Sequence, residues 1–288
     1  MLDRHRLLAV LAHPDDETFG IGGTLALYAR RGVDVHLICA TRGEVGAAPP
    51  ELLHGFASLA ELRESELRCA ASLLGLASVT FLDYRDSGMP GSPDNQHPQA
   101  LAAAPLEEVA ARVAHWIRRL RPDVVITFDP QGGYRHPDHI AIQRATQAAF
   151  FAAGDPGSDP KGLAPHQPAK LYYHTFPRGV VRILVFFMRL MGRNPRKWGR
   201  NQDIDLVEIA SVEFPVHARI DIRPVIEVRA EASACHASQG GQSGGRITRW
   251  ISHLLGGRET FMRAHPPAPP GLREHDLFEG LDGVPPRG

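Results

Sequence analysis

The sequence predicts an α/β fold, with a Rossmann-like, mostly parallel sheet and helices on both faces. Short, continuously apolar runs alternate along the chain with longer amphipathic stretches. A wholly apolar strand suits a parallel sheet covered on both sides, and the alternation is typical of βαβ units. Polar clusters follow the first four apolar runs directly. Because ligands bind beyond the carboxyl ends of such strands, we expect the active site at the C-terminal ends of the strands.

The apolar runs and the helical periodicity locate the elements in order. Apolar runs predict strands at 6–12, 33–40, 79–82, 124–128, 170–175 and 204–209. Amphipathic stretches predict helices at 24–31, 58–74 and 105–120, and a further helix within 222–236. Gly/Pro-rich stretches at 154–168 and 266–271 bracket a less regular C-terminal third.

Length and composition favour one catalytic domain. A chain of 288 residues with 43% hydrophobic side chains can bury one sizeable core. We predict a single domain over 1–265, with a motif-rich core at 1–153 and a specificity-determining third at 154–265. The tail at 266–288 has no periodicity, so it either lies over the body or is mobile.

The charge balance and the cysteine content indicate which partners and which cellular compartment to expect. Lys plus Arg balances Asp plus Glu at 32 each, so a small, near-neutral substrate fits better than nucleic acid or a membrane. The three cysteines, Cys39, Cys69 and Cys235, lie far apart without a CxxC pair, and we expect reduced, mostly buried thiols. The N-terminus resembles neither a signal peptide nor an anchor. These features predict a cytoplasmic protein.

Two His-Pro-Asp pieces carry the strongest chemical signal. His13 and Asp16 leave the end of the first apolar run together, and His139 follows the fourth run. Two histidines and one carboxylate leave a position open on zinc, which is typical of a catalytic site. Either piece alone would suit an ordinary helix start, so the prediction of one Zn²⁺ per chain depends on both. Another divalent ion such as Fe²⁺ is the alternative.

The neighbours of these ligands indicate amide hydrolysis. With Asp16 turned to the metal, Asp15 projects elsewhere on the turn and could take the proton from the attacking water. His136 could stabilise a tetrahedral oxyanion or protonate the leaving amine, with Asp138 orienting it. A serine hydrolase has no visible nucleophile because the sequence lacks a GxSxG segment. The glycines at 20–23 lack the full spacing of a dinucleotide loop.

The sequence resembles the LmbE-like, or PIG-L, family of metal-dependent deacetylases. Its signature corresponds to His13-Pro-Asp-Asp-Glu17 and His136-Pro-Asp-His139, and the resemblance covers 6–153. It extends to Thr41-x-Gly-Glu44, Glu61-Leu-Arg-Glu-Ser-Glu66, Asp86-Ser-Gly-Met89 and His236-Ala-Ser-Gln239. The resemblance implies a Rossmann-like fold, a catalytic base at Asp15 and metal ligands at His13, Asp16 and His139.

Within the family, the motifs at 86–89 and 132–136 look most like deacetylases and amidases of mycothiol metabolism, which act on a glucosaminyl-inositol core. The resemblance implies a substrate-binding set of Glu44, Arg63, Asp86 and His236. Tyr134 would assist at the carbonyl or simply pack. Arg63 could also be a surface arginine in a Glu/Arg ladder, and His236 could line the crevice or only cap a helix.

These observations predict zinc-dependent hydrolysis of the N-acetyl amide of an N-acetylglucosaminyl substrate, releasing acetate and a glucosamine derivative. One alternative is an amidase that cleaves a larger acyl or cysteinyl conjugate from glucosaminyl-inositol. Another is a metal-binding module without turnover. Asp15 and His136 argue against the module, because a retired site would need neither a base nor an acid.

The stretch 178–200 combines apolar and basic residues without any acidic residue. It is too short to span a bilayer, which needs about 20 apolar residues. One interpretation is a basic amphipathic helix on a membrane surface. We favour the other, a helix whose apolar side packs over the crevice or against a second subunit of a homo-oligomer. The resemblance implies that such a lid contributes to the aglycone pocket.

Overall fold

A computed structural model describes residues 4–158, 162–175, 178–197, 205–241 and 257–281. Seven strands form one sheet in the order β3-β2-β1-β4-β5-β7-β6. In chain order they are β1 (Arg6–Leu11), β2 (Asp34–Cys39), β3 (Ser78–Phe81), β4 (Val124–Phe128), β5 (Lys170–Thr175), β6 (Ala218–Asp221) and β7 (Arg258–His265). The strands from β3 to β5 run parallel, whereas β7 is antiparallel to both β5 and β6. The predicted mostly parallel sheet is confirmed.

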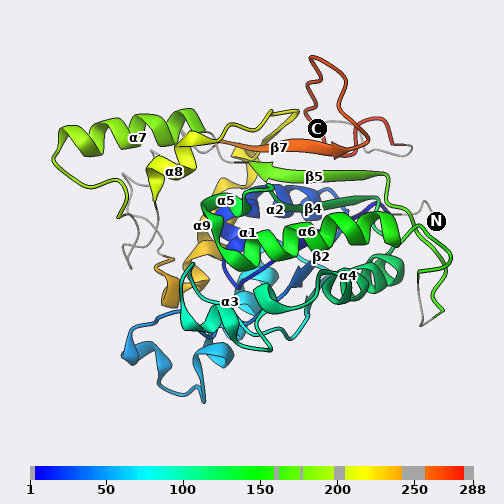
Figure 1. Ribbon diagram of the computed structural model, residues 1–288. Helices are drawn as coiled ribbons and strands as arrows, with labels where there is room; N and C mark the ends of the chain where they lie inside the picture. Colours follow the sequence, from blue (N-terminus) through cyan, green and yellow to red (C-terminus); the bar gives the residue numbers. More distant parts are fainter. Residues whose placement is uncertain (1–3, 159–161, 176–177, 198–204, 242–256, 282–288) are drawn as a thin grey trace.

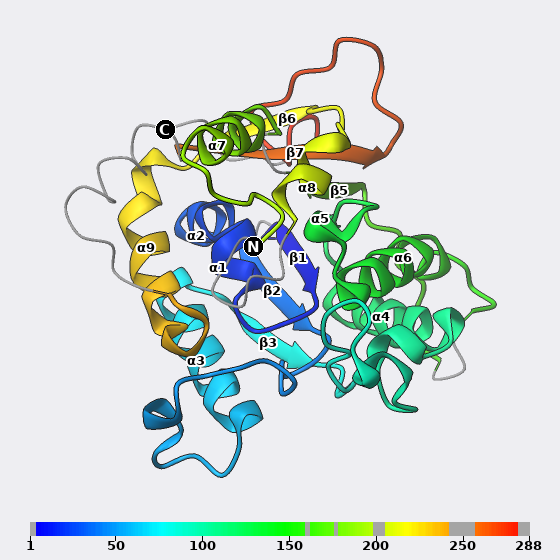
Figure 2. The ribbon, with the colours of Figure 1, turned by 60° about the vertical axis from the view of Figure 1, so that its left-hand side comes forward.

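Helices cover both faces of this sheet. On one face α2 (Gly22–Arg30), α3 (Leu59–Leu74) and α9 (Ile226–Cys235) pack together, and on the other α4 (Leu106–Leu120) packs against α6 (Pro137–Ala152) (Figure 1 and Figure 2). Helices α1 (Asp16–Gly20), α5 (Gly132–Arg135) and α7 (Arg178–Leu190) come next in the chain after β1, β4 and β5, and the short α8 (Leu206–Ser211) lies between α7 and β6. No helix among the described ranges is long and apolar enough to cross a bilayer.

The core explains why the first and fourth apolar runs become central strands. Every residue from Leu7 to Leu11 is at most 1% exposed, and Val124, Val125 and Ile126 are fully buried. The carboxyl ends of β1 and β4 are therefore fixed side by side, and the polar residues that follow them start from one edge of the sheet.

Two sequence-based expectations in the C-terminal third are corrected. The strand expected at 204–209 is helix α8 over its described part, because the Asp205 carboxylate caps it by accepting hydrogen bonds from the amides of Val207 (2.8 Å) and Glu208 (3.1 Å). Strands β6 and β7 were not expected, because charged residues interrupt the apolar pattern of β7. One of these charges, Glu259, caps α2 by accepting from the amides of Gly23 (3.0 Å) and Thr24 (2.7 Å).

The described part of the tail lies over the body. Leu277 and Phe278 are buried in the main core. The Tyr28 hydroxyl donates to Asp276 at 2.9 Å and accepts from the Leu277 amide at 2.7 Å. Lys170 Nζ donates to Glu274 at 2.9 Å. These contacts place 274–278 against the sheet and α2.

The prediction of three reduced thiols is wrong for two of them. Cys69 and Cys235 form a disulfide that joins α3 to the end of α9, while Cys39 is a buried free thiol. The two cysteines are separated by 166 positions, and only the packing of α3 against α9 brings them together. The cysteines therefore do not indicate a reducing compartment.

Candidate active site

The turn after β1 brings the first signature residues into a fixed arrangement. The Asp16 carboxylate accepts from the His13 amide at 2.7 Å, and the Glu17 carboxylate accepts from the Asp15 amide at 3.0 Å. Asp15 adopts a φ of 125°, a region that non-glycine residues rarely enter. The two side-chain bonds hold this strained backbone, and strain of this kind clusters at functional sites.

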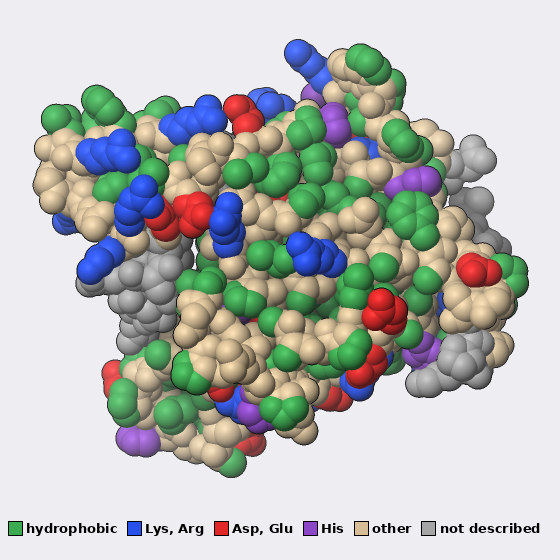
Figure 3. Space-filling view, in the orientation of Figure 1, with side chains coloured by type: hydrophobic (Ala, Val, Ile, Leu, Met, Phe, Trp, Pro, Cys, Tyr) green, Lys and Arg blue, Asp and Glu red, His purple; other side chains and the backbone are tan. Residues whose placement is uncertain are grey.

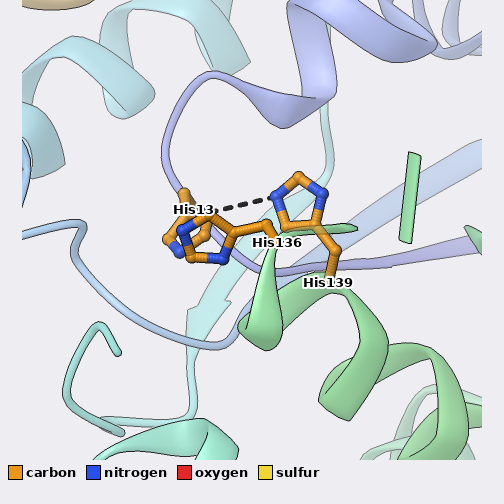
Figure 4. Close-up of side chains that lie close together, drawn as sticks. All are labelled: His13, His136 and His139. Carbon is orange, nitrogen blue, oxygen red and sulfur yellow. Dashed lines mark hydrogen bonds between the residues drawn. The ribbon is translucent and has the colours of Figure 1, made fainter. Parts of the chain in front are cut away.

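The three predicted metal ligands converge in the structure. His13 Nδ1 lies 3.2 Å from His139 Nε2 and 3.6 Å from Asp16 Oδ2, and His139 Nε2 lies 3.3 Å from Asp16 Oδ1. Tetrahedral zinc with bonds of about 2.0–2.1 Å keeps its ligand atoms about 3.3 Å apart. The donor set therefore fits one divalent ion. Figure 4 shows the rings of His13, His136 and His139 together, with the His13–His139 contact dashed.

The Asp138 carboxylate orients His13, and only the backbone amide of Asp138 contacts His136, which corrects the expected role of this side chain. The fully buried Asp138 carboxylate lies 3.0 Å from His13 Nε2 and accepts from the amide of Ser87 at 2.9 Å and from its hydroxyl. A metal-bound histidine usually donates its other ring N–H to a carboxylate. This contact leaves His13 Nδ1 on the side of His139 and Asp16, where an ion would be held. Sequence spacing could not show it, because it depends on the direction of the His13 ring.

We expect Asp138→Asn to weaken metal binding by about 10–100-fold, because His13 loses the carboxylate that fixes its ring. Titration against a competing chelator measures the dissociation constant. Asp94→Asn is the control, since Asp94 pairs with Arg85 outside this cluster and its loss should leave the constant unchanged. An unchanged constant in Asp138→Asn would contradict the orienting contact.

His136 caps α6, and its Nδ1 accepts from the Asp138 amide at 3.2 Å. Burial, together with the nearby His13 and His139 rings, lowers the pKa of His136. The ring is therefore neutral, with Nδ1 occupied as an acceptor and its hydrogen on Nε2. Tyr134 packs edge-on against His139, and burial raises the pKa of its hydroxyl, which stays protonated.

Arg63 is part of the site and does not belong to a surface ladder. Its buried guanidinium donates to the carbonyls of Pro14 (2.6 Å) and Gly43 (2.8 Å) and to Asp15 Oδ2 (3.2 Å). Gly43 has a φ of 65°, and a Cβ there would lie 2.1 Å from Arg63 Nη1, so the guanidinium needs glycine at that position. Burial raises the pKa of Asp15 to about 6, although Arg63 opposes this shift.

Three members of the expected substrate-binding set, Glu44, Asp86 and His236, are not among the residues that line the active-site cavity. The buried Asp86 accepts from the amides of Gly88 (2.8 Å) and Val45 (3.3 Å), and Glu44 accepts from the Asp86 amide at 3.1 Å. His236 is wholly buried, with its Nε2 at 2.6 Å from Glu17 Oε1. These contacts support the loops around the site. Of the two alternatives for His236, lining the crevice is wrong, whereas the residue does cap a helix, because it ends α9.

A cavity of about 570 Å³ opens over these groups. Seven of the predicted site residues line it, and they are His13, Asp15, Asp16, Arg63, Tyr134, His136 and His139. Phe19, Met89, Phe128, His174 and Gln239 also line it and were not among the residues predicted for the site. Phe128 ends β4 and His174 lies at the end of β5, so position at the carboxyl end of a strand was the available signal. No described residue of 178–197 lines the cavity, so the lid expectation is not met there.

Comparison with known proteins agrees with this geometry. The PIG-L family model, described as GlcNAc-PI de-N-acetylase, matches residues 8–150. The chain is 36% identical over 296 residues to the 1D-myo-inositol 2-acetamido-2-deoxy-alpha-D-glucopyranoside deacetylase of Streptomyces scabiei (strain 87.22), covering 97% of this chain and 91% of that protein. It is 37% identical over 292 residues to the protein of the same name from Thermobifida fusca (strain YX), covering 96% and 100%.

The fold also has a solved counterpart. N,N'-diacetylchitobiose deacetylase from Pyrococcus horikoshii superposes with a TM-score of 0.62 at 21% identity, covering 91% of this chain and 84% of that one. This likeness concerns the fold alone, whereas the relatives from Streptomyces and Thermobifida match almost from end to end. The resemblance inferred from the two His-Pro-Asp pieces is confirmed, and the chain belongs to the PIG-L family.

Proposed function

We propose that the protein hydrolyses the N-acetyl amide of an N-acetylglucosaminyl substrate and releases acetate and a free amine. The observation that carries this proposal is the convergence, in one cavity, of a three-ligand metal site with Asp15, Tyr134 and His136. The relatives named as deacetylases of an inositol-linked 2-acetamido-2-deoxy-glucopyranoside support an amino-sugar substrate.

His13, Asp16 and His139 would hold the ion. Two imidazole nitrogens and one carboxylate favour zinc, and Fe²⁺ is the main competitor for the same donors. When bound, the ion supplies Lewis acidity that activates water and polarises the acetyl carbonyl. Asp138 keeps His13 in the orientation this requires.

Asp15 is the proposed general base. Its carboxylate lines the cavity beside Asp16, and Arg63 holds one of its oxygens at 3.2 Å. Asp15 accepts a proton as the water oxygen bonds to the carbonyl carbon. The C–N bond then breaks, and the proton passes to the leaving nitrogen, so the products are acetate and the amine.

His136 and Tyr134 are the proposed donors to the oxyanion. Both line the cavity, the first as a neutral ring with its hydrogen on Nε2 and the second as a protonated phenol. Donors that are held in place before the reaction stabilise the charge that develops on the carbonyl oxygen. Neither group has to reorganise when that charge appears.

We expect acetate release from N-acetylglucosaminyl-inositol to exceed hydrolysis of its larger acyl and cysteinyl analogues by at least about tenfold in kcat/KM, because one methylene in a fitted pocket already changes rates by about 10–200-fold. A panel of acyl glucosaminides and an acetylated peptide, assayed with metal-loaded enzyme, measures this. Faster hydrolysis of the cysteinyl conjugate would make the protein an amidase of that substrate. Faster acetate release from the acetylated peptide would contradict the proposal that the substrate is an amino sugar.

A further inference from the structure

Helix α7 stands out from the body with an uncovered apolar side. It packs inward through Val185 and Met188, which form a small cluster with Leu206 of α8. On its opposite side, Ile183, Phe186, Phe187 and Leu190 are exposed, as is Met191 directly after the helix, all by 51–72%. In Figure 3, hydrophobic and basic side chains gather at the place of α7 in Figure 1, at the upper left. We call these five residues the outer stripe.

The outer stripe concentrates the exposed apolar surface of the protein. Of the nine large hydrophobic side chains that are exposed among the described residues, five belong to it. The four members from 183 to 190 recur three or four positions apart, which is the spacing of one helix side. Single exposed hydrophobic residues are normal, whereas a contiguous set marks an interaction site.

Cations flank this stripe, and three of them have no acidic partner among the described residues. The sequence has no Asp or Glu from 178 to 202. Arg182 pairs with Glu213, and Arg196 pairs with Asp205. Exposed Arg189, Arg193 and Lys197 have no ion pair with any residue that the structure describes. Arg182 and Arg189, seven positions apart, share the flank beside the apolar side chains.

We propose that α7 rests on an anionic lipid surface, with the outer stripe inserted at the headgroup level and the flanking cations on lipid phosphates. An apolar side bordered by arginines is the pattern of interfacial helices, which lie in the plane of the membrane surface. A second copy of the chain fits less well as the partner, because a symmetric contact through this stripe would place Arg189 and Arg193 of one copy near the same two arginines of the other.

The position of α7 would bring the cavity edge close to that surface. The helix follows β5 at the carboxyl edge of the sheet, and it packs on α8. Arg135 at the end of α5 pairs with Glu208 of α8 at 2.7 Å. Helix α8 therefore lies between α7 and the segment that carries His136. The proposed lipid binding does not depend on which substrate the enzyme uses.

Co-sedimentation with vesicles tests this proposal. We expect the full chain to bind vesicles of phosphatidylcholine with about 30% phosphatidylglycerol and to bind pure phosphatidylcholine at least about tenfold more weakly, since each cation near an anionic surface contributes about fivefold in affinity. Phe187→Glu should reduce binding at least about tenfold. Phe151→Glu is the matched control, because Phe151 on α6 and Phe187 are both 51% exposed.

A second variant, Arg189→Glu with Arg193→Glu, reverses two positive charges without changing the inner packing of α7. It replaces Phe187→Glu as the test if circular dichroism shows that Phe187→Glu does not fold. It should also lose at least about tenfold in affinity. Equal binding to both vesicle types, no binding at low salt, or an equal loss in Phe151→Glu would overturn the proposal. A dimer seen by light scattering in the wild type and dissolved by Phe187→Glu would instead make the outer stripe a subunit contact.

Discussion

His13→Ala and Asp16→Ala are each expected to reduce bound metal from about one ion per chain to almost none, since either change leaves only two of three ligands. His13 Nδ1 lies 3.2 Å from His139 Nε2 and 3.6 Å from Asp16 Oδ2, so each of the two residues would supply one of three converging ligand atoms. Elemental analysis of dialysed protein measures the ratio. The result should not depend on whether an active substrate has been found.

His136→Ala provides the control for this experiment. His136 lies in the same buried cluster, and its ring centre is 4.5 Å from that of His13. Because its Nδ1 accepts from the Asp138 amide and its hydrogen is on Nε2, neither ring nitrogen should bind a metal, and the variant should keep its metal. Metal loss in His136→Ala with retention in Asp16→Ala would assign the third ligand to His136.

Asp15→Asn should lose about 10²–10⁴-fold in kcat while keeping its metal, because general-base catalysis contributes that much and the amide cannot accept the proton. Asparagine has nearly the same shape and can still accept the hydrogen bond from Arg63, so the turn should stay in place. Acetate release and metal content, measured on the same sample, separate a lost base from a lost ion.

Asp83→Asn is the control for this change, since exposed Asp83 pairs with Arg42 and does not line the catalytic cavity. It should retain both metal and turnover. If a fully metal-loaded Asp15→Asn enzyme turned over at nearly the rate of the unmodified protein, another group would be the base.

The sequence predicted the parallel half of the fold well, because five strands there are short and strongly apolar or follow clear helical stretches. It also predicted that His13, Asp16 and His139 come together, since the segments that carry them follow strands that end at one edge of the sheet. In both cases the decisive information is local. A buried parallel strand must be apolar along its length, and the residues that follow it are confined to the carboxyl edge of the sheet.

The roles of Asp138 and His236 could not be predicted in this way. Asp138 turns toward His13, which is 125 positions away, and His236 turns toward Glu17, which is 219 positions away. Spacing within a motif shows which side chains leave a turn together but does not show which partner each one reaches. Strand β7 was missed for a related reason: its charged residues have partners far away in the sequence, such as the α2 amides that donate to Glu259.

The Cys69–Cys235 bond connects the stability of the fold to the chemical surroundings of the protein. It closes a loop of 166 positions between α3, which carries Arg63, and α9, which leads to His236. In the chain-entropy description, closing a loop of that length destabilises the unfolded chain by about 5 kcal/mol. This amount is comparable to the whole folding free energy of many domains, which is about 5–15 kcal/mol. The same amino-acid sequence thus has a wide stability margin where thiols are oxidised and a narrow one where glutathione keeps them reduced.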